Sequence, residues 1–166
     1  MLRKTCLLVI FFVSSFFLTF NLSAAGFSIL EQSAAGLGSS LAGMTANTDD
    51  PGAVFFNPAS SAWIEETRIM LGVHSLIGNV RYSERNSNVV GKQDRNITSP
   101  AFVPNLYLVQ PLTENLNLNL GISATSGTST TYRDRWQGRY FALKTEVSVI
   151  EISPSLSYKI TDELSL

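Results

Sequence analysis

Cysteine and histidine are almost absent from this sequence. The single cysteine, Cys6, lies in a leader that we expect to be removed, so the mature chain has no disulfide, no thiol nucleophile and no thiolate metal site. The single histidine, His74, has no metal-ligating or catalytic cluster around it in the sequence, and we expect it to be a lumen-facing or interfacial side chain. We therefore predict no metal site, no cofactor and no enzymatic activity.

A surplus of positive charge is also missing. The whole chain carries 12 basic and 13 acidic residues, and removal of Arg3 and Lys4 with the leader leaves 10 against 13, a net charge of −3. A protein that binds nucleic acid needs many basic residues to neutralise phosphates. The charge balance therefore argues against nucleic acid as a partner.

One long apolar run is present, at the N-terminus. Arg3 and Lys4 precede it, it covers residues 6–20, and small residues follow it over 22–26. This is the layout of a signal peptide, and the run is shorter than the roughly 20 residues that span a bilayer as a helix. We assign residues 1–25 to a cleavable signal peptide, cut after Ala24 or Ala25, with an uncleaved membrane anchor as the alternative.

The next segment, residues 26–63, is rich in Gly, Ala and Ser and has no sustained alternation of polar and apolar residues. Residues 32–44 are compatible with short helical turns, and the sequences at 50–52 and 57–58 predict turns. Such a segment is expected to pack against another part of the protein rather than to fold by itself.

From residue 68 onward, polar and apolar residues alternate as in a strand with two different faces. The clearest runs cover residues 116–125 and 150–161, weaker ones cover 101–112 and 68–79, and a fifth strand begins at Leu164. Each clear run has about the ten residues that a tilted strand needs to cross a bilayer. Pro154 removes a backbone donor, so we expect it at a bulge or a strand end.

The connections between these runs alternate in length, since residues 79–100 and 127–146 are long whereas 111–115 and 161–163 are short. Outer-membrane barrels have short periplasmic turns and long external loops. The predicted fold class is therefore all-β, a transmembrane antiparallel β-barrel. A soluble sandwich or a lipocalin-like barrel, which also alternates, is the alternative.

Several short motifs occur in a fixed order along the mature chain: Ala25-Gly26-Phe27, Glu31-Gln32-Ser33, Gly36-Leu37-Gly38, Asp49-Asp50, Phe55-Phe56-Asn57-Pro58-Ala59, Val103-Pro104-Asn105, Trp136-Gln137-Gly138-Arg139-Tyr140 and Pro154-Ser155-Leu156. Together they resemble the FadL family of outer-membrane transporters for long-chain fatty acids and other hydrophobic compounds, which includes the TodX-type channels for aromatic hydrocarbons. The resemblance covers essentially the whole mature chain.

The resemblance implies a 14-stranded barrel whose lumen is plugged by an N-terminal hatch. Residues 26–63 would be the hatch, beginning at Gly26 and Phe27, and residues 64–166 the first four to five strands of an incomplete barrel. The motif Asn57, Pro58 and Ala59 would contact a kink of the third strand near Ser126 and Gly127, where a lateral opening is gated by the hatch. A glycine there tolerates departure from the ladder.

The implied function is passive transport of hydrophobic molecules, most of all long-chain fatty acids, with aromatic hydrocarbons as the other substrate class. Outer-membrane lipid and lipopolysaccharide would surround the protein, which we expect to be a monomer when full length. A diffusion porin or structural outer-membrane protein is the first alternative, and an outer-membrane hydrolase the second. Family members are more than twice this size, so we expect a fragment or truncated product, because an open sheet edge is not tolerated in hydrocarbon.

Overall fold

The computed structural model describes residues 26–83, 86, 88–92 and 97–166, so the predicted signal peptide lies outside the described residues. Four strands form one sheet in which sequence neighbours pair antiparallel, in the order β1-β2-β3-β4. Their bounds are β1 Arg68–Leu76, β2 Ala101–Pro111, β3 Leu116–Thr131 and β4 Lys144–Tyr158. The predicted all-β class is confirmed, although β3 continues six residues beyond the expected end and β4 begins six residues earlier than expected.

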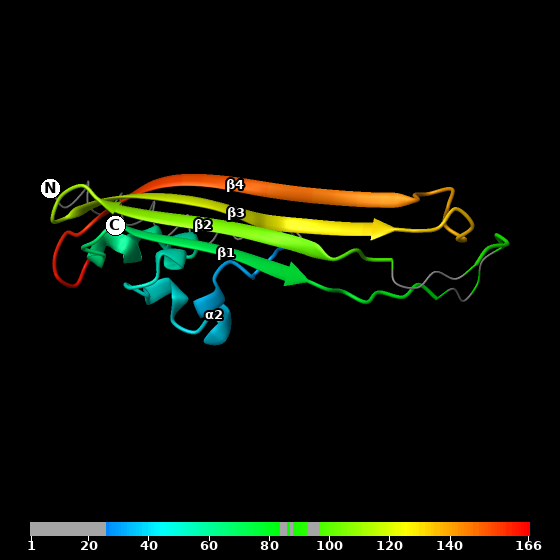
Figure 1. Ribbon diagram of the computed structural model, residues 1–166, viewed down its shortest axis with the longest axis horizontal. Coiled ribbons are helices and arrows are strands. Elements are labelled where there is room, and N and C mark those ends of the chain that lie inside the picture. The colour runs from blue at the N-terminus through cyan, green and yellow to red at the C-terminus, as the bar shows by residue number, and fades with distance from the viewer. Residues whose placement is uncertain (1–25, 84–85, 87, 93–96) are drawn as a thin grey trace, which may run out of the picture.

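The long and short connections lie at opposite ends of the sheet (Figure 1). Residues 77–100 and 132–143 connect strands at one end, and the short turn 112–115 lies at the other. After β4, the backbones of Tyr158 and Leu166 exchange two hydrogen bonds of 2.8 and 2.9 Å. This pairing is what a fifth strand beginning near Leu164 would make.

Short helical segments of residues 26–63, here called the hatch segment, lie against one face of the sheet (Figure 1). They are α2 Ala34–Gly38, η1 Met44–Ala46, η2 Pro51–Phe55 and η3 Pro58–Trp63. Asp50 and Asn57 each precede a proline, and their Oδ1 atoms accept hydrogen bonds from Gly52 N at 2.8 Å and Ala59 N at 3.2 Å. A side-chain acceptor at the cap and a proline at the first helical position both favour a helix start. The predicted turns are therefore starts of 3-10 helices. Among the described residues, the structure contains no helix with the length and apolar character needed to span a membrane.

The two faces of the sheet have opposite polarity. The face toward the hatch segment carries buried polar side chains, among them Asn105, Asn119 and Ser157. The other face, called the outward face, is apolar and uncovered, with Leu71 73% exposed and Ile152 65% exposed. A soluble sheet buries its apolar face, whereas a membrane barrel turns it to lipid. The structure therefore supports the barrel over the soluble sandwich or lipocalin-like alternative.

The apolar core between the hatch segment and the sheet is small. Val54 and Ile64 from the hatch side pack with Tyr107 and Val109 of β2, and Phe55 and Met70 border this cluster. Buried hydrogen bonds add to this contact, among them Gln32 Nε2 to Ala124 O at 2.8 Å and Asn117 Nδ2 to Ser61 O at 2.6 Å. The position of the hatch segment therefore depends on hydrogen bonds as well as on apolar packing.

The prediction that Pro154 lies at a bulge or strand end is wrong. Pro154 lies inside β4 and pairs in register with Leu120. Within the described chain β4 is the edge of the sheet, where a proline is tolerated because its missing N–H can point away from the ladder. The irregularity lies instead in β3, between Ala124 and Ser126.

Candidate functional site

The pairing between β2 and β3 ends before either strand does. Asn105 and Ser123 form the last β2–β3 pair, and beyond them the residues of β2 pair with β1. Two residues further along, β3 has a bulge at Thr125, because Ala124 pairs with Ile150 and Ser126 with the adjacent Val149. A bulge bends its strand and locally disrupts the ladder. We call this place, where β3 departs from β2, the seam.

The start of the hatch segment pairs with β3 at the seam. Ile29 N donates to Thr125 O at 3.0 Å, and Gly127 N donates to Phe27 O at 3.1 Å, so that Ser28 and Ser126 face each other as an antiparallel bridge. Residues 27–29 thus act as a short added strand on β3. The backbone groups of the bulge, which β2 leaves unpaired, are satisfied in this way.

Gln32 holds the same region through its side chain. Its Nε2 donates to Ala124 O at 2.8 Å and to Ile29 O at 3.0 Å, and its Oε1 accepts from the Tyr107 hydroxyl at 3.3 Å. Gln32 is fully buried, so these bonds are formed away from bulk water. One side chain therefore ties the hatch segment to β2 and β3 on both sides of the seam.

A cavity of about 560 Å³ adjoins the seam. Its walls include apolar side chains from the hatch segment, β1, β2 and β4, and the charged residues among its lining are Lys144 and Glu146, which form an ion pair. Cavities of this size are typical of small-molecule sites. Its apolar lining residues include Ile29, Leu76, Phe102, Val103 and Val147.

The other end of the hatch segment is fixed by a buried polar cluster, here called the anchor cluster, which consists of Ser61, Asn117, Asn119 and Ser157. Ser61 Oγ lies 2.8 Å from both Asn119 Oδ1 and Ser157 Oγ. Asn117 Nδ2 donates to the carbonyl oxygens of Ser61 at 2.6 Å and Ile64 at 2.9 Å. Because all four side chains are buried, breaking one bond leaves a polar group without water to replace its partner.

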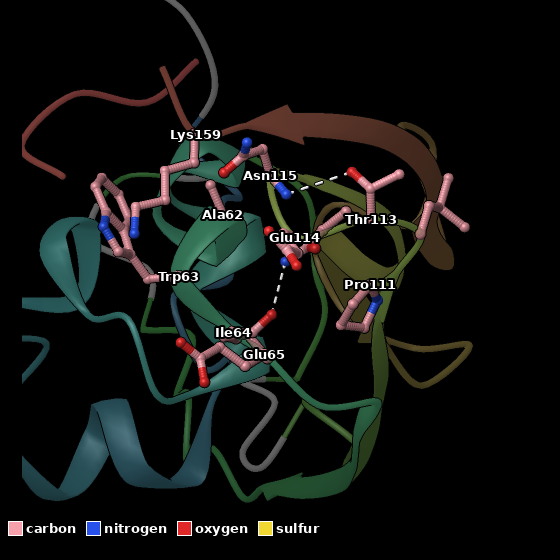
Figure 2. Close-up of a pocket in the computed structure, with 11 residues that line it drawn as sticks. Ala62, Trp63, Ile64, Glu65, Pro111, Thr113, Glu114, Asn115 and Lys159 are labelled. Atoms are coloured by element: carbon pink, nitrogen blue, oxygen red, sulfur yellow. Dashed lines mark hydrogen bonds between the residues drawn. The ribbon is translucent and has the colours of Figure 1, made fainter. Parts of the chain in front are cut away.

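A second cavity, of about 610 Å³, lies at the short-turn end, between the end of η3 and the β2–β3 turn. Figure 2 shows Trp63, Glu65, Glu114 and Lys159 around it. Its ionisable side chains are mainly acidic, and Lys159 also pairs with Asp162 at 3.0 Å. Such a lining is poorly suited to an apolar molecule with a negative head group.

The predicted site residues are only partly brought together. Ser126 lies at the bulge, with Gly127 next to it, and Phe27 contacts Gly127 through its backbone, whereas the adjacent Gly26 is exposed. Asn57, Pro58 and Ala59 lie elsewhere along the sheet. Within the described chain, none of their hydrogen bonds reaches Ser126 or Gly127.

The motif instead organises the hatch segment itself. Asn57 Nδ2 donates to Thr45 O at 2.8 Å, and its Oδ1 caps η3. Pro58 lines a small cavity of about 130 Å³ together with Gly121 and Ser123, which precede the bulge on β3. Pro58 thus lies near β3 just before the bulge, while the Asn57 side chain caps its own helix.

The sequence did not predict that the anchor cluster and Gln32 would hold the hatch segment to the strands. Alternation had placed Asn117 and Asn119 on the polar face of a strand, but a polar face alone does not say what covers it. One feature of the sequence could have indicated this contact. Asn117 and Asn119 lie on the face that a barrel turns inward, and the segment expected to fill the barrel has many small residues.

Comparisons with known proteins agree with this architecture. Residues 15–166 match the family described as outer membrane protein transport protein (OMPP1/FadL/TodX). The chain is 32% identical over 159 residues to outer membrane protein P1 of Haemophilus influenzae, a match that covers 87% of this chain and 35% of that protein. It is 26% identical over 142 residues to the long-chain fatty acid transport protein of Escherichia coli strain K12, covering 86% and 32%.

A solved structure has the same fold. The crystal structure of a Pseudomonas aeruginosa FadL homologue matches with a TM-score of 0.64 and 26% identity, over 83% of this chain and 35% of that chain. The chain thus spans about a third of the length of the relatives it matches.

Proposed function

The chain belongs to the outer membrane protein transport protein (OMPP1/FadL/TodX) family, and from this premise we propose that the protein carries long-chain fatty acids, or hydrophobic molecules of similar size, across the bacterial outer membrane. In this proposal residues 26–63 are the hatch of the barrel and residues 64–166 belong to its wall. The observation that carries it is the seam, because there the wall is completed by a segment of the hatch. A diffusion porin would instead need an open hydrated lumen, which a hatch on the inner face opposes.

We infer that the transported molecule leaves sideways through the seam. Two backbone hydrogen bonds and the side chain of Gln32 hold residues 27–32 against β3, whereas the anchor cluster fixes η3 at the other end of the hatch segment. When residues 27–32 detach, β2 and β3 have no ladder between them beyond Asn105 and Ser123. The hatch therefore opens at one end and stays bound at the other.

The depth of the seam supports lateral release. Along β4, Tyr158 is the last residue of the strand, at the short-turn end, and Ile150 is the partner of Ala124 next to the bulge. Eight residues separate the two. With about 3.3 Å per residue and a tilt of about 40°, this separation is about 20 Å along the membrane normal, within an apolar band about 25 Å tall. A fatty acid that leaves through the seam enters lipid directly. The cost of exposing its acyl chain to water, about 0.8 kcal/mol per CH2 group, is therefore not incurred.

Asn57, Pro58 and Ala59 have a different part in this mechanism from the one that their resemblance implied. Asn57 caps η3 and holds the backbone of Thr45, so the motif keeps the fixed end of the hatch segment in shape. The lateral opening is lined by Ser126 and Gly127, and the moving part starts at Phe27. Replacement of Asn57 should then reduce transport by loosening the fixed end.

A reversible cross-link tests the proposal. Ser28 and Ser126 are a non-hydrogen-bonded antiparallel pair, whose Cα atoms are typically about 4.5 Å apart and suit a disulfide. The protein expressed from its complete gene with Ser28→Cys and Ser126→Cys should lose most uptake of radiolabelled oleate when oxidised and regain it after reduction. A disulfide would hold residues 27–29 on β3 and keep the seam closed.

The chain offers a matched control. Lys159 and Ser165 form an antiparallel bridge of the same type at the short-turn end, far along the sheet from the seam. Oxidised Lys159→Cys/Ser165→Cys should transport oleate like the reduced protein. Equal uptake by oxidised and reduced Ser28→Cys/Ser126→Cys protein, with the cross-link shown by mass spectrometry, would refute the lateral gate.

A further inference from the structure

The described residues of the two long connections, 77–83, 86, 88–92, 97–100 and 132–143, lie toward the end of the sheet away from the short turn (Figure 1), and contacts join the two connections there. Trp136 is at the centre of these contacts and is only 9% exposed. Its ring stacks on Tyr132 with centroids 3.8 Å apart and planes at 11°, and Tyr82 meets it edge-on at 5.3 Å. Aromatic pairs of this kind stabilise by about 0.5–1.5 kcal/mol beyond their buried area. Tyr82 belongs to the first connection and Tyr132 to the second, so the indole joins the two.

Backbone contacts reinforce this junction. Lys92 N donates to Arg135 O at 2.9 Å, and Arg139 Nη1 donates to Val90 O at 3.1 Å and to Trp136 O at 3.0 Å. The guanidinium of Arg139 also lies 4.8 Å from the ring centroid of Tyr140. Three cationic residues of the two connections are thus held in one neighbourhood. We call Lys92, Arg135 and Arg139 the cationic tip.

The charge of this region differs from that of the rest of the chain. Residues 77–100 and 132–143 carry seven Lys or Arg residues against three Asp or Glu, whereas the rest of the chain carries five against ten. The overall net charge of −1 does not reveal this separation of basic from acidic residues. A local field of this kind attracts anions to the outer end of the protein.

Exposed apolar side chains lie beside the cationic tip. Val90 is 92% exposed and Phe141 95% exposed, and the Tyr140 ring under Arg139 is also exposed. Tyr140 and Phe141 are adjacent, and exposed apolar groups that lie together mark interaction sites more often than single scattered residues do. Rings next to guanidinium groups provide flat apolar faces together with fork-shaped donors for phosphate.

We propose that the cationic tip, with Tyr140 and Phe141, binds the phosphorylated sugar core of lipopolysaccharide in the surrounding outer leaflet. Arg135, Arg139 and Lys92 take the phosphate groups, and the two rings cover the apolar faces of the sugars. Phosphate groups and sugar rings occur together in this glycolipid. A phospholipid offers phosphate without sugar rings, and a free fatty acid offers neither.

The height of the tip favours the sugar core over the membrane surface. Seven residues separate Ala124 at the bulge from Thr131 at the end of β3. At about 3.3 Å per residue and a tilt of about 40°, the second connection begins about 18 Å above the seam, and Lys92 of the first connection is hydrogen-bonded to it there. The cationic tip therefore lies in the sugar layer, above the acyl chains.

The test measures binding of purified lipopolysaccharide to the detergent-solubilised protein, expressed from its complete gene. We expect Lys92→Gln/Arg135→Gln to weaken binding at least tenfold, because each removes one phosphate contact, and Phe141→Ser to weaken it about threefold. Neither the Lys92 nor the Arg135 side chain has a hydrogen bond or ion pair to the described residues, so both connections should keep their structure. Trp136 fluorescence checks that they do.

Arg81→Gln is the control for position, since it removes one positive charge, as each substitution of the double variant does, but at the base of the first connection, near the Ile97–Val80 backbone hydrogen bond; it should bind like the unaltered protein. Dephosphorylated lipopolysaccharide and phosphatidylglycerol vesicles should both bind more weakly by tenfold or more. Equal binding of phosphorylated and dephosphorylated lipopolysaccharide, equal binding of the vesicles, or an unaffected Lys92→Gln/Arg135→Gln variant would each overturn the proposal. Oleate uptake is independent of this result.

Discussion

Replacement of Asn117 by alanine should release the end of η3 from the sheet and leave the sheet itself in place. The Asn117 side chain is buried, and its Nδ2 donates to the carbonyl oxygens of Ser61 at 2.6 Å and Ile64 at 2.9 Å. Each hydrogen bond contributes about 0.5–1.5 kcal/mol, so the loss of both should cost about 1–3 kcal/mol. A factor of ten corresponds to about 1.4 kcal/mol, so local opening should rise roughly 5- to 150-fold.

Amide hydrogen exchange of a peptide that covers η3 measures this opening. Ser60 N and Ile64 N are both hydrogen-bonded in the closed form, to Asn57 O at 3.1 Å and Ser61 O at 3.0 Å, so their exchange reports local detachment. We expect their exchange to accelerate by the factor given above in Asn117→Ala. Amides of the β2–β3 ladder should be unchanged, because that ladder does not involve the Asn117 side chain.

The nearby Asn115 provides the control, since it lies in the exposed turn and its side chain makes no hydrogen bond within the described chain. Asn115→Ala should change stability by less than about 0.5 kcal/mol. The reasoning would be refuted if Asn117→Ala left the exchange of η3 within twofold of the unaltered protein. Equal acceleration in η3 and in the β2–β3 ladder would refute it too, because the effect would then be global.

Two further predictions concern close packing and lipid exposure. Gly52→Ala should lower the free energy of unfolding by about 1–3 kcal/mol in urea titrations, because the added Cβ would lie 3.0 Å from Ser33 Cβ, whereas Gly38→Ala meets nothing within 4 Å and should be nearly neutral. Ile152→Arg on the outward face should destabilise the protein folded in lipid vesicles by about 2–4 kcal/mol, and Leu112→Arg, at the turn, by about 0–1 kcal/mol. Equal effects within either pair would contradict the corresponding packing or membrane argument.

Much of the sheet could be predicted from alternation alone. Residues 116–125 and 150–161 have one apolar and one polar face, and the structure places the first run in β3 and residues 150–158 of the second in β4, with the apolar face uncovered. The ends of the strands were less predictable, because the outer parts of β3 and β4 consist largely of Thr, Ser and charged residues. The hydrogen bonds of the ladder continue there, but no hydrophobic pattern in the sequence predicts them.

The candidate site was predictable in its components but not in its contacts. The resemblance placed a kink near Ser126 and Gly127, and the structure has a bulge one residue away, at Thr125. The resemblance also implied that Asn57 lies at that kink. In the structure, the residues hydrogen-bonded there are Phe27, Ile29 and Gln32. A segment with no periodicity has no preferred face, so its partners depend on three-dimensional fit.

The sequence by itself determined the strands, which face of each is apolar, and the order of long and short connections, because these follow from a period of two and from local turn chemistry. Only the tertiary structure decided the extent of each ladder, the added strand at residues 27–29 and the anchor cluster. It also gathered the cationic tip from two distant connections. Each of these features depends on contacts between groups that are far apart in the chain. Hydrogen bonds between buried polar groups stabilise these contacts, but neither segment carries a sequence pattern that predicts them.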